Sequence, residues 1–189
     1  MTDTNVFRLR RPQLILSLCD RTGNWSQPYE DDGYDVIRVD IEHGQDARLL
    51  ELPNRPVHGI LAAPPCTVFA NSGARWVRSD DDMREGLSVV DACCRLILAT
   101  RPKWWALENP TGKLSRYLGP PTYTFQPSHH GDPYTKMTCL WGDFTVPERT
   151  PVAATMGSKM HRLGPSPERA ALRSVTPEGF AQAFFEANP

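Results

Sequence analysis

No hydrophobic run in this 189-residue sequence approaches the roughly 20 apolar residues that a membrane-spanning helix needs. The first residues, MTDTNVFRLRRPQ, contain no apolar stretch of the kind found in a secretory signal. The sequence also has no internal repeat and no low-complexity tract. We therefore expect a cytoplasmic protein with a single domain over residues 1–189, because this length is too short for two domains of ordinary size.

Cysteine pairs are also lacking. The chain has five cysteines, an odd number, and none of them stands in a CxxC pair. This arrangement favours free thiols in a reducing compartment over a disulfide framework, and it gives no indication of a zinc site. We expect no bound metal.

Net charge says little about partners, because 21 basic residues nearly balance 22 acidic ones. The distribution of charge is more informative. Residues 30–51 hold eight acids against two arginines, whereas the segment 156–173 carries four cations against one acid. Such asymmetry allows one face to bind a small cofactor and another to meet a polyanion, although scattered solvated charge explains it equally well.

Short apolar runs alternate with helical patterns along the first two thirds of the chain. Runs that predict buried strands lie at 14–18, 34–39, 59–63 and 104–107. A helix is expected from the capping residue Ser79 to just before Pro102, and another over 177–187. Residues 123–126 and 137–141 suggest an antiparallel pair at the sheet edge, and 146–168 a loop. The alternation predicts an α/β fold whose mostly parallel sheet has ligand sites after its strands.

Two short motifs follow neighbouring predicted strands. Pro64-Pro65-Cys66 holds a thiol on a backbone restricted by two prolines, and thiolates are strong nucleophiles. Glu108-Asn109-Pro110 places a carboxyl group where burial would raise its pKa and let it donate a proton. Taken alone, each has a simpler interpretation: a buried structural cysteine, and a solvated glutamate in a turn.

Together, PPC and ENP resemble the nucleophile and acid motifs of the DNA cytosine-5 methyltransferases. Further segments resemble other motifs of this family in the same order: SLCDRTGNW, DVIRVDIEHGQD, QPSHHGDPYTKMTCLWG and LRSVTPEGFAQAFFEAN. The resemblance covers most of the chain, and PPC and ENP are its most specific parts. It implies a Rossmann-like fold and transfer of a methyl group from S-adenosylmethionine to carbon 5 of cytosine.

The resemblance also implies catalytic roles. Cys66 would add to ring carbon 6 of the cytosine, and Glu108 would protonate or hydrogen-bond ring nitrogen 3. Lys136 is the cation nearest to the position where the family has arginines that hold the substrate. Pro65 and Asn109 would lie beside the base, which must be flipped out of a duplex or presented in a single strand.

The cofactor residues implied by the resemblance fall in two segments. The first is the turn after the first strand, where Gly23 would let the backbone approach the methionine part of the cofactor. The residues assigned there are Cys19, Asp20, Gly23, Asn24 and Trp25. In the second segment Asp40 would bind the ribose hydroxyls, Ile41 would pack on the adenine, and Asp46 would accept from its amino group. For Asp46, a simple turn residue is an equal alternative.

The family's separate target-recognition domain is missing, since only about thirty residues lie between Trp141 and Arg173. Compact forms of this kind resemble bacteriophage proteins, in which case the compartment is the host cytoplasm. We expect DNA contact by the basic segment itself, through Lys159, Arg162 and Arg169. Two alternatives stay open. One is an enzyme that acts on a free nucleotide or RNA or uses a modified cofactor, and the other is a non-catalytic nucleic-acid-binding module.

Overall fold

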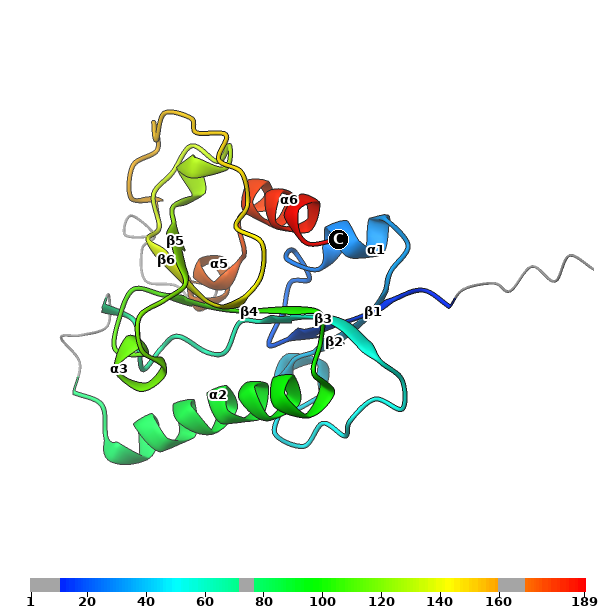
Figure 1. The fold of residues 1–189 in the computed structure, drawn as a ribbon. Coiled ribbons are helices and arrows are strands. Elements are labelled where there is room, and N and C mark those ends of the chain that lie inside the picture. The colour runs from blue at the N-terminus through cyan, green and yellow to red at the C-terminus, as the bar shows by residue number, and fades with distance from the viewer. Residues whose placement is uncertain (1–10, 72–76, 160–168) are drawn as a thin grey trace, which may run out of the picture.

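A computed structural model describes residues 11–71, 77–159 and 169–189 (Figure 1). One six-stranded sheet has the order β2-β1-β3-β4-β6-β5. Its strands are β1 (Leu14–Leu18), β2 (Asp35–Val39), β3 (Val57–Ala62), β4 (Trp104–Pro110), β5 (Tyr123–Phe125) and β6 (Thr138–Asp143). The helices are α1 (Gln27–Asp31), α2 (Asp80–Thr100), α3 (Ser115–Leu118), α5 (Arg169–Ser174) and α6 (Glu178–Ala187), with short 3-10 turns η1 (Ile41–His43) and η3 (Pro127–His129).

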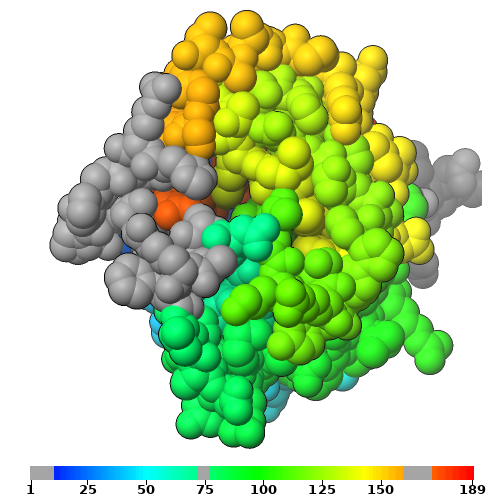
Figure 2. Space-filling model, turned by 90° about the vertical axis from the view of Figure 1, so that its left-hand side faces the viewer, coloured from blue at the N-terminus to red at the C-terminus, as the bar shows by residue number. Residues whose placement is uncertain are grey.

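The mostly parallel sheet predicted from the sequence is confirmed. β1 pairs in parallel with β2 and β3, and β3 pairs in parallel with β4. β6 runs antiparallel to both β4 and β5, so the two late strands form the predicted antiparallel pair at one edge. All four parallel strands therefore end at one side of the sheet, which Figure 2 shows facing the viewer.

Alternation along β1 divides the core between the two faces of the sheet. Leu14, Leu16 and Leu18 face one side and pack in a cluster with residues of α2, while Ile15 faces the other side. Figure 1 shows the same division, with α2 under the sheet and α1 and α6 above it. This is the two-sided burial that the continuous apolar strands require.

α2 begins at the capping residue that the sequence predicts. The Ser79 hydroxyl accepts from the Asp82 backbone N–H at 3.0 Å, and the Asp82 carboxylate accepts from the Ser79 backbone N–H at 3.0 Å. The helix ends at Arg101, which adopts the left-handed conformation with φ 49°. The reciprocal cap fixes where the helix starts and so places its first turns beside the carboxyl ends of the strands.

The second face of the sheet is aromatic and is covered by the C-terminal helix. The Trp104 ring lies directly over Gly59, where a Cβ atom would stand 2.2 Å from the indole. Phe180 and Phe184 of α6 are fully buried in the same cluster. Because the glycine leaves space for the indole, the helix can approach the sheet closely.

Within the described residues, no helix is long and apolar enough to cross a membrane. The same residues contain no group of three or more histidine, cysteine or carboxylate side chains that could hold a metal ion.

Candidate active site

The two predicted chemical motifs lie together at the carboxyl ends of β3 and β4. Ala62 pairs with Leu107 in the parallel register, so the PPC segment leaves the sheet next to Glu108, which is still paired with Leu140 of β6. Figure 2 looks onto this edge and shows a hollow in which the orange segment of α5 is visible. The sequence prediction that ligand chemistry gathers at this edge therefore has a structural basis.

Asn109 joins the two motifs directly. Its Nδ2 donates a hydrogen bond of 2.9 Å to the backbone carbonyl of Pro64, two residues before the candidate nucleophile. The Asn109 side chain is 0% exposed, and its Oδ1 has no hydrogen-bond partner among the described residues. Asn109 thus fixes the segment that leads to Cys66, and the substrate contact expected from the sequence stays a prediction.

The segment after Cys66 is fixed by backbone contacts with the chain that follows β4. The Cys66 carbonyl accepts from the N–H groups of Phe69 and Ala70, and the Phe69 carbonyl accepts from Lys113 N–H at 2.7 Å. A Cβ atom on Gly112 would lie 2.0 Å from the Phe69 carbonyl oxygen. Only glycine permits this approach, so the backbone that presents the thiol is held at both ends.

The electrostatic surroundings of Cys66 and Glu108 are coupled. Burial raises the pKa of the Cys66 thiol, the Glu108 carboxylate raises it further, and Lys136 and Arg173 lower it. Burial also raises the pKa of Glu108, while Lys136 acts in the opposite direction. The free protein therefore favours a neutral thiol and a carboxyl group that holds its proton to higher pH than an exposed glutamate does.

Lys136 and Arg173 are the cations that this geometry brings to the nucleophile. Lys136 precedes β6 and was assigned from the sequence. Arg173 lies in α5, and the sequence analysis counted it only within the basic segment. No local pattern marks Arg173 as a neighbour of Cys66, because more than 100 residues separate the two and only the tertiary fold brings α5 to this edge.

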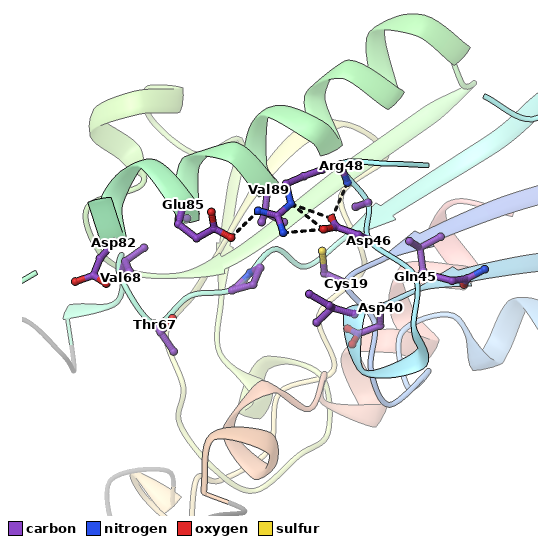
Figure 3. A pocket seen from close by; sticks show the side chains of 15 residues that line it. Cys19, Asp40, Gln45, Asp46, Arg48, Thr67, Val68, Asp82, Glu85 and Val89 are labelled. Atoms are coloured by element: carbon purple, nitrogen blue, oxygen red, sulfur yellow. Dashed lines mark hydrogen bonds and ion pairs between the residues drawn. The ribbon is translucent and has the colours of Figure 1, made fainter. Parts of the chain in front are cut away.

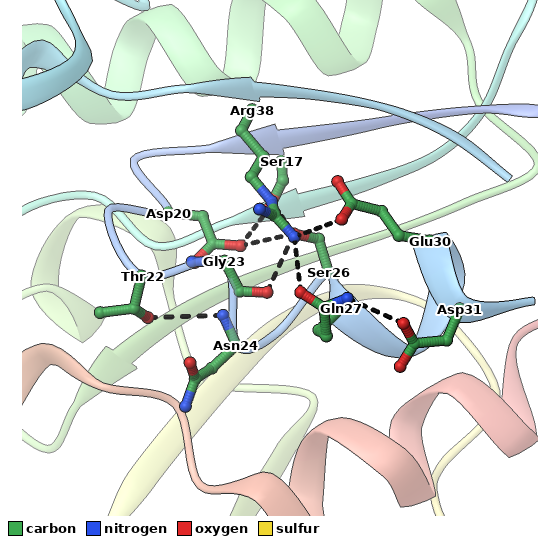
Figure 4. A network of polar contacts seen from close by, with 10 residues as sticks. All are labelled: Ser17, Asp20, Thr22, Gly23, Asn24, Ser26, Gln27, Glu30, Asp31 and Arg38. Atoms are coloured by element: carbon green, nitrogen blue, oxygen red, sulfur yellow. Dashed lines mark hydrogen bonds and ion pairs between the residues drawn. The ribbon is translucent and has the colours of Figure 1, made fainter.

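The turn after β1 is built around the buried carboxylate of Asp20 (Figure 4). Asp20 accepts from the Ser17 hydroxyl at 2.7 Å, the Ser26 hydroxyl at 2.9 Å and the Gly23 backbone N–H at 2.9 Å. The side chain is 6% exposed. Its oxygens are therefore engaged in shaping the turn and are not presented to the adjoining pocket.

Gly23 is favoured in this turn by its backbone conformation. Its φ of +73° lies in the left-handed region, and the end of the flexible Arg38 side chain lies beside it, with Cζ 2.4 Å from where a Cβ atom would stand. The Arg38 guanidinium donates to the Ser26 hydroxyl at 3.0 Å and forms an ion pair with Glu30 at 2.7 Å. Gly23 thus gives the turn its left-handed backbone, and its predicted approach to the cofactor stays a prediction.

Asn24 and Trp25 connect the turn to the C-terminal part of the chain. The Asn24 Nδ2 donates to the backbone carbonyl of Thr176 at 3.5 Å. Trp25 is 1% exposed, and its ring centroid lies 6.0 Å from that of Phe180 and 5.5 Å from that of Phe184. These two positions belong to the core and its edge, so they do not line the pocket described next.

A pocket of about 320 Å³ lies between the ends of β1, β2 and β3 and the first turns of α2 (Figure 3). Five residues assigned to the site from the sequence line it: Cys19, Asp40, Ile41, Asp46 and Pro65. The helix contributes Asp82, Glu85, Gly86 and Val89, which the sequence analysis missed. Their spacing is typical of the solvent-facing side of an amphipathic helix, and only the neighbouring loops convert that side into a pocket wall.

Asp40 and Ile41 present complementary chemistry to this pocket. One carboxylate oxygen of Asp40, Oδ1, accepts from the Glu42 backbone N–H at 2.9 Å, while Oδ2 has no partner among the described residues. Ile41 is 69% exposed although it is a large apolar side chain. A free carboxylate oxygen beside an uncovered apolar side chain suits a ligand with a hydroxylated sugar next to a flat ring.

Asp46 is engaged within the protein. Its carboxylate accepts a forked pair of hydrogen bonds from the Arg48 guanidinium, which also forms an ion pair of 2.5 Å with Glu85 of α2. Arg48 lowers the pKa of Asp46, chiefly through these side-chain hydrogen bonds. Arg48 thus ties the loop after η1 to α2, and Asp46 could serve a ligand amino group only through its remaining lone pairs.

The cations expected to contact DNA are placed in part. The Lys159 ammonium group lies 5.2 Å from the centre of the Tyr134 ring, a cation–π arrangement. Arg162 lies outside the described residues, and Arg169 is the first residue of α5.

The pocket fits S-adenosylmethionine on its chemistry and size. A volume of about 320 Å³ lies within the range of roughly 300–1,000 Å³ that small-molecule sites occupy. Four carboxylates line it against one arginine, and that arginine is already paired with two of them. The excess of negative charge suits a cationic sulfonium ligand with an amino group.

Comparisons with known proteins bear on the fold. No protein-family profile and no curated protein sequence matches the chain. Among solved structures, the fold is similar to that of an inferred DNA modification methyltransferase encoded within a prophage of E. coli, with a TM-score of 0.54 and 16% sequence identity. The match covers 75% of this chain and 53% of that chain, so the chain spans about half the length of its structural relative. The chain has a Rossmann-like α/β fold, as predicted, and shares it with that protein.

Proposed function

We propose that this protein is an S-adenosylmethionine-dependent DNA methyltransferase that modifies carbon 5 of cytosine, with Cys66 as nucleophile and Glu108 as acid. The observation that carries the proposal is the juxtaposition of these two side chains at the ends of adjacent parallel strands, with Lys136 beside both. The pocket at the ends of β1 and β2 supports the choice of cofactor.

The chemistry assigned to this chain begins at the thiol. The Cys66 sulfur, as thiolate, forms a bond to ring carbon 6, and the electron pair of the 5,6 double bond moves into the ring. Glu108 donates a proton or a hydrogen bond to ring nitrogen 3, where negative charge would otherwise accumulate. S-adenosylmethionine, when bound, would supply an electrophilic methyl group for carbon 5 and leave as S-adenosylhomocysteine. Loss of the carbon-5 proton to solvent, return of any proton from ring nitrogen 3 to Glu108 and departure of the Cys66 thiolate then restore the aromatic ring and the free enzyme.

The raised pKa values of both groups fit this division of roles. A carboxyl group with a raised pKa is available as an acid near neutral pH, as Glu108 must be. The thiol of Cys66 has to lose its proton for attack, and Lys136 and Arg173 favour its thiolate. The phosphates of a bound nucleic acid would partly neutralise these two cations and so weaken their effect on the pKa of Cys66. The cations therefore have to stay close to the sulfur.

The test is a covalent trap. Incubation with S-adenosylmethionine and DNA containing 5-fluorocytosine should yield a stable adduct, because fluorine cannot leave carbon 5 as a cation. Mass spectrometry of the digested adduct should place the bond on the peptide that contains Cys66. A Cys66→Ser variant should lose both the adduct and methyl transfer by several orders of magnitude.

Matched controls make the trap specific. Cys94→Ser changes a half-buried thiol on α2, away from the strand ends, and should leave adduct formation unchanged. Adduct formation by Cys66→Ser at the parent rate would refute the assignment. Methylation of free cytidine nucleotide, with none of DNA, would show that the substrate is a nucleotide instead.

A further inference from the structure

One surface next to Cys66 is not accounted for by the proposed chemistry. It consists of Lys113, Arg116 and Tyr117, in and just before α3, together with Lys136 and Met137 before β6; we call it the α3 surface. Figure 2 shows α3 on the same face of the molecule as the hollow at the strand ends.

Hydrogen bonds tie the parts of this surface to one another and to the nucleophile segment. Thr111 N–H donates to the Met137 carbonyl at 3.3 Å, and Asn71 N–H donates to the Thr111 carbonyl at 3.1 Å. Lys113 N–H donates to the Phe69 carbonyl, three residues after Cys66. The α3 surface is therefore held at a fixed position relative to the thiol.

Two cations of this surface, Lys113 and Arg116, form no ion pair with another described residue. The six ion pairs within residues 11–71 and 77–159 all join residues between Arg21 and Glu85. Neither Lys113 nor Arg116 forms one within those parts, and Arg116 is exposed. Cations that are not neutralised by the protein can bind an anionic ligand. The phosphates of a nucleic acid are such a ligand, because they present several negative charges in succession.

Exposed stacking surface lies among these cations. Tyr117 is 52% exposed, and its ring stands edge-on to Phe69 with centroids 6.4 Å apart. Met137 is 46% exposed. An exposed ring together with neighbouring cations is the combination with which proteins bind unpaired strands, because every base can stack on an aromatic face. The phosphates of a continuous duplex would use the cations and leave the ring unused.

We infer that the α3 surface binds a single strand of DNA next to the target cytosine, with phosphates on Lys113 and Arg116 and a neighbouring unpaired base on Tyr117. This rests on the proposed function, since the strand is the one whose cytosine enters the Cys66 site. The substrate is then held by a rigid surface at the catalytic edge. This surface binds unpaired DNA more tightly than paired DNA.

The first experiment measures DNA affinity against salt by fluorescence anisotropy, with a 20-nucleotide single strand and with its duplex. Lys113→Gln combined with Arg116→Gln should flatten the slope of log affinity against log salt by about 0.7 for each phosphate of the single strand that these cations neutralise in the parent protein. The matched control is Arg101→Gln with Lys103→Gln, which removes the same charge before β4, at the opposite end of the parallel strands, and should leave the slope unchanged. Equal slopes for the two double variants overturn the inference.

The second experiment separates stacking from folding. Tyr117→Ala should weaken binding of the single strand by about five- to a hundred-fold and binding of the duplex by much less, while Tyr117→Phe should bind as the parent does. A decrease equal on both DNAs, or a Tyr117→Phe variant as weak as Tyr117→Ala, overturns the role of the ring. Thermal unfolding of each variant shows that the fold is kept.

The two proposals can fail separately. A parent protein that binds single strands through these residues but transfers no methyl group would refute the proposed function and leave the α3 surface standing. If the Lys113→Gln, Arg116→Gln variant transferred methyl groups with an unchanged KM for DNA, the role of the α3 surface would be refuted and the proposed function would be unaffected.

Discussion

The chain from β1 through α2 and the chain after α2 use charge in opposite ways. Residues 14–100 contain 14 acidic and 8 basic residues, whereas residues 101–159 contain 4 acidic and 7 basic ones. The six ion pairs within residues 11–71 and 77–159 all fall in the first region. The first region thus neutralises most of its described cations internally and leaves carboxylates around the pocket, while the second leaves cations at the nucleophile's side of the same edge. Each region suits one of two ligands of opposite charge.

The largest expected effect is on the chemical step and comes from the second region. Glu108→Gln removes the acid but keeps a side chain of similar size, so turnover should fall by roughly 10²–10⁴. Cofactor affinity should not change, because Glu108 does not line the pocket between β2 and α2. Single-turnover methyl transfer and calorimetric titration of the cofactor measure the two quantities. If cofactor affinity fell as far as the rate, the two regions would not be separate functional units.

The next effect tests the acidic region. Asp40→Ala should weaken S-adenosylmethionine binding by about ten- to a hundred-fold, the range for charge-assisted hydrogen bonds of roughly 1.5–3 kcal/mol, with little change in the rate at saturating cofactor. Asp40→Asn retains an acceptor for the Glu42 N–H and isolates the effect of the charge. Glu51→Ala, an exposed acid outside the pocket, is the control. Calorimetry showing unchanged affinity for both Asp40 variants would remove this residue from the cofactor site.

The smallest effect concerns pH. Lys136 lowers the pKa of both Cys66 and Glu108, so Lys136→Gln should raise both. Thiol reactivity requires the thiolate, so the variant's alkylation curve for Cys66 should move to higher pH, by less than about ten-fold in rate at a given pH. Alkylation with iodoacetamide, followed by mass spectrometry of the Cys66 peptide from pH 7 to 10, gives the curve. Lys103→Gln, at the opposite end of the parallel strands, should leave it in place, and an unmoved curve in both variants would place Lys136 away from the thiol.

The sequence predicted the elements that position the site better than it predicted the site's walls. Strand runs, the Ser79 cap and the antiparallel edge pair are local signals, and the structure confirms them. The neighbouring ends of β3 and β4 followed from the parallel sheet. The carboxylates of α2 and the position of Arg173 could not be predicted, because they depend on which loop packs against a helix face and on where a distant helix settles.

The turn after β1 shows a different limit of prediction from sequence motifs. The sequence analysis assigned Asp20, Gly23 and Trp25 to the cofactor, and in the structure Asp20 and Gly23 shape the turn while the Trp25 side chain packs in the core. A motif marks where a loop must have one shape, and it does not distinguish the residues that make that shape from those that touch a ligand. The partners of Trp25 lie more than 150 residues away, beyond the reach of any local pattern.

That long-range closure has a consequence for how the protein is made. The Tyr29 hydroxyl donates to the backbone carbonyl of Asn188 at 2.9 Å, across 159 positions of the chain, and Asn24 reaches Thr176 across 152. Contacts of such sequence separation form late, because the entropy of closing the loop must be overcome first. The turn is synthesised well before α6, yet it can reach its final shape only after α6 has left the ribosome. A nascent chain therefore carries the strands and the thiol before the turn beside them is complete.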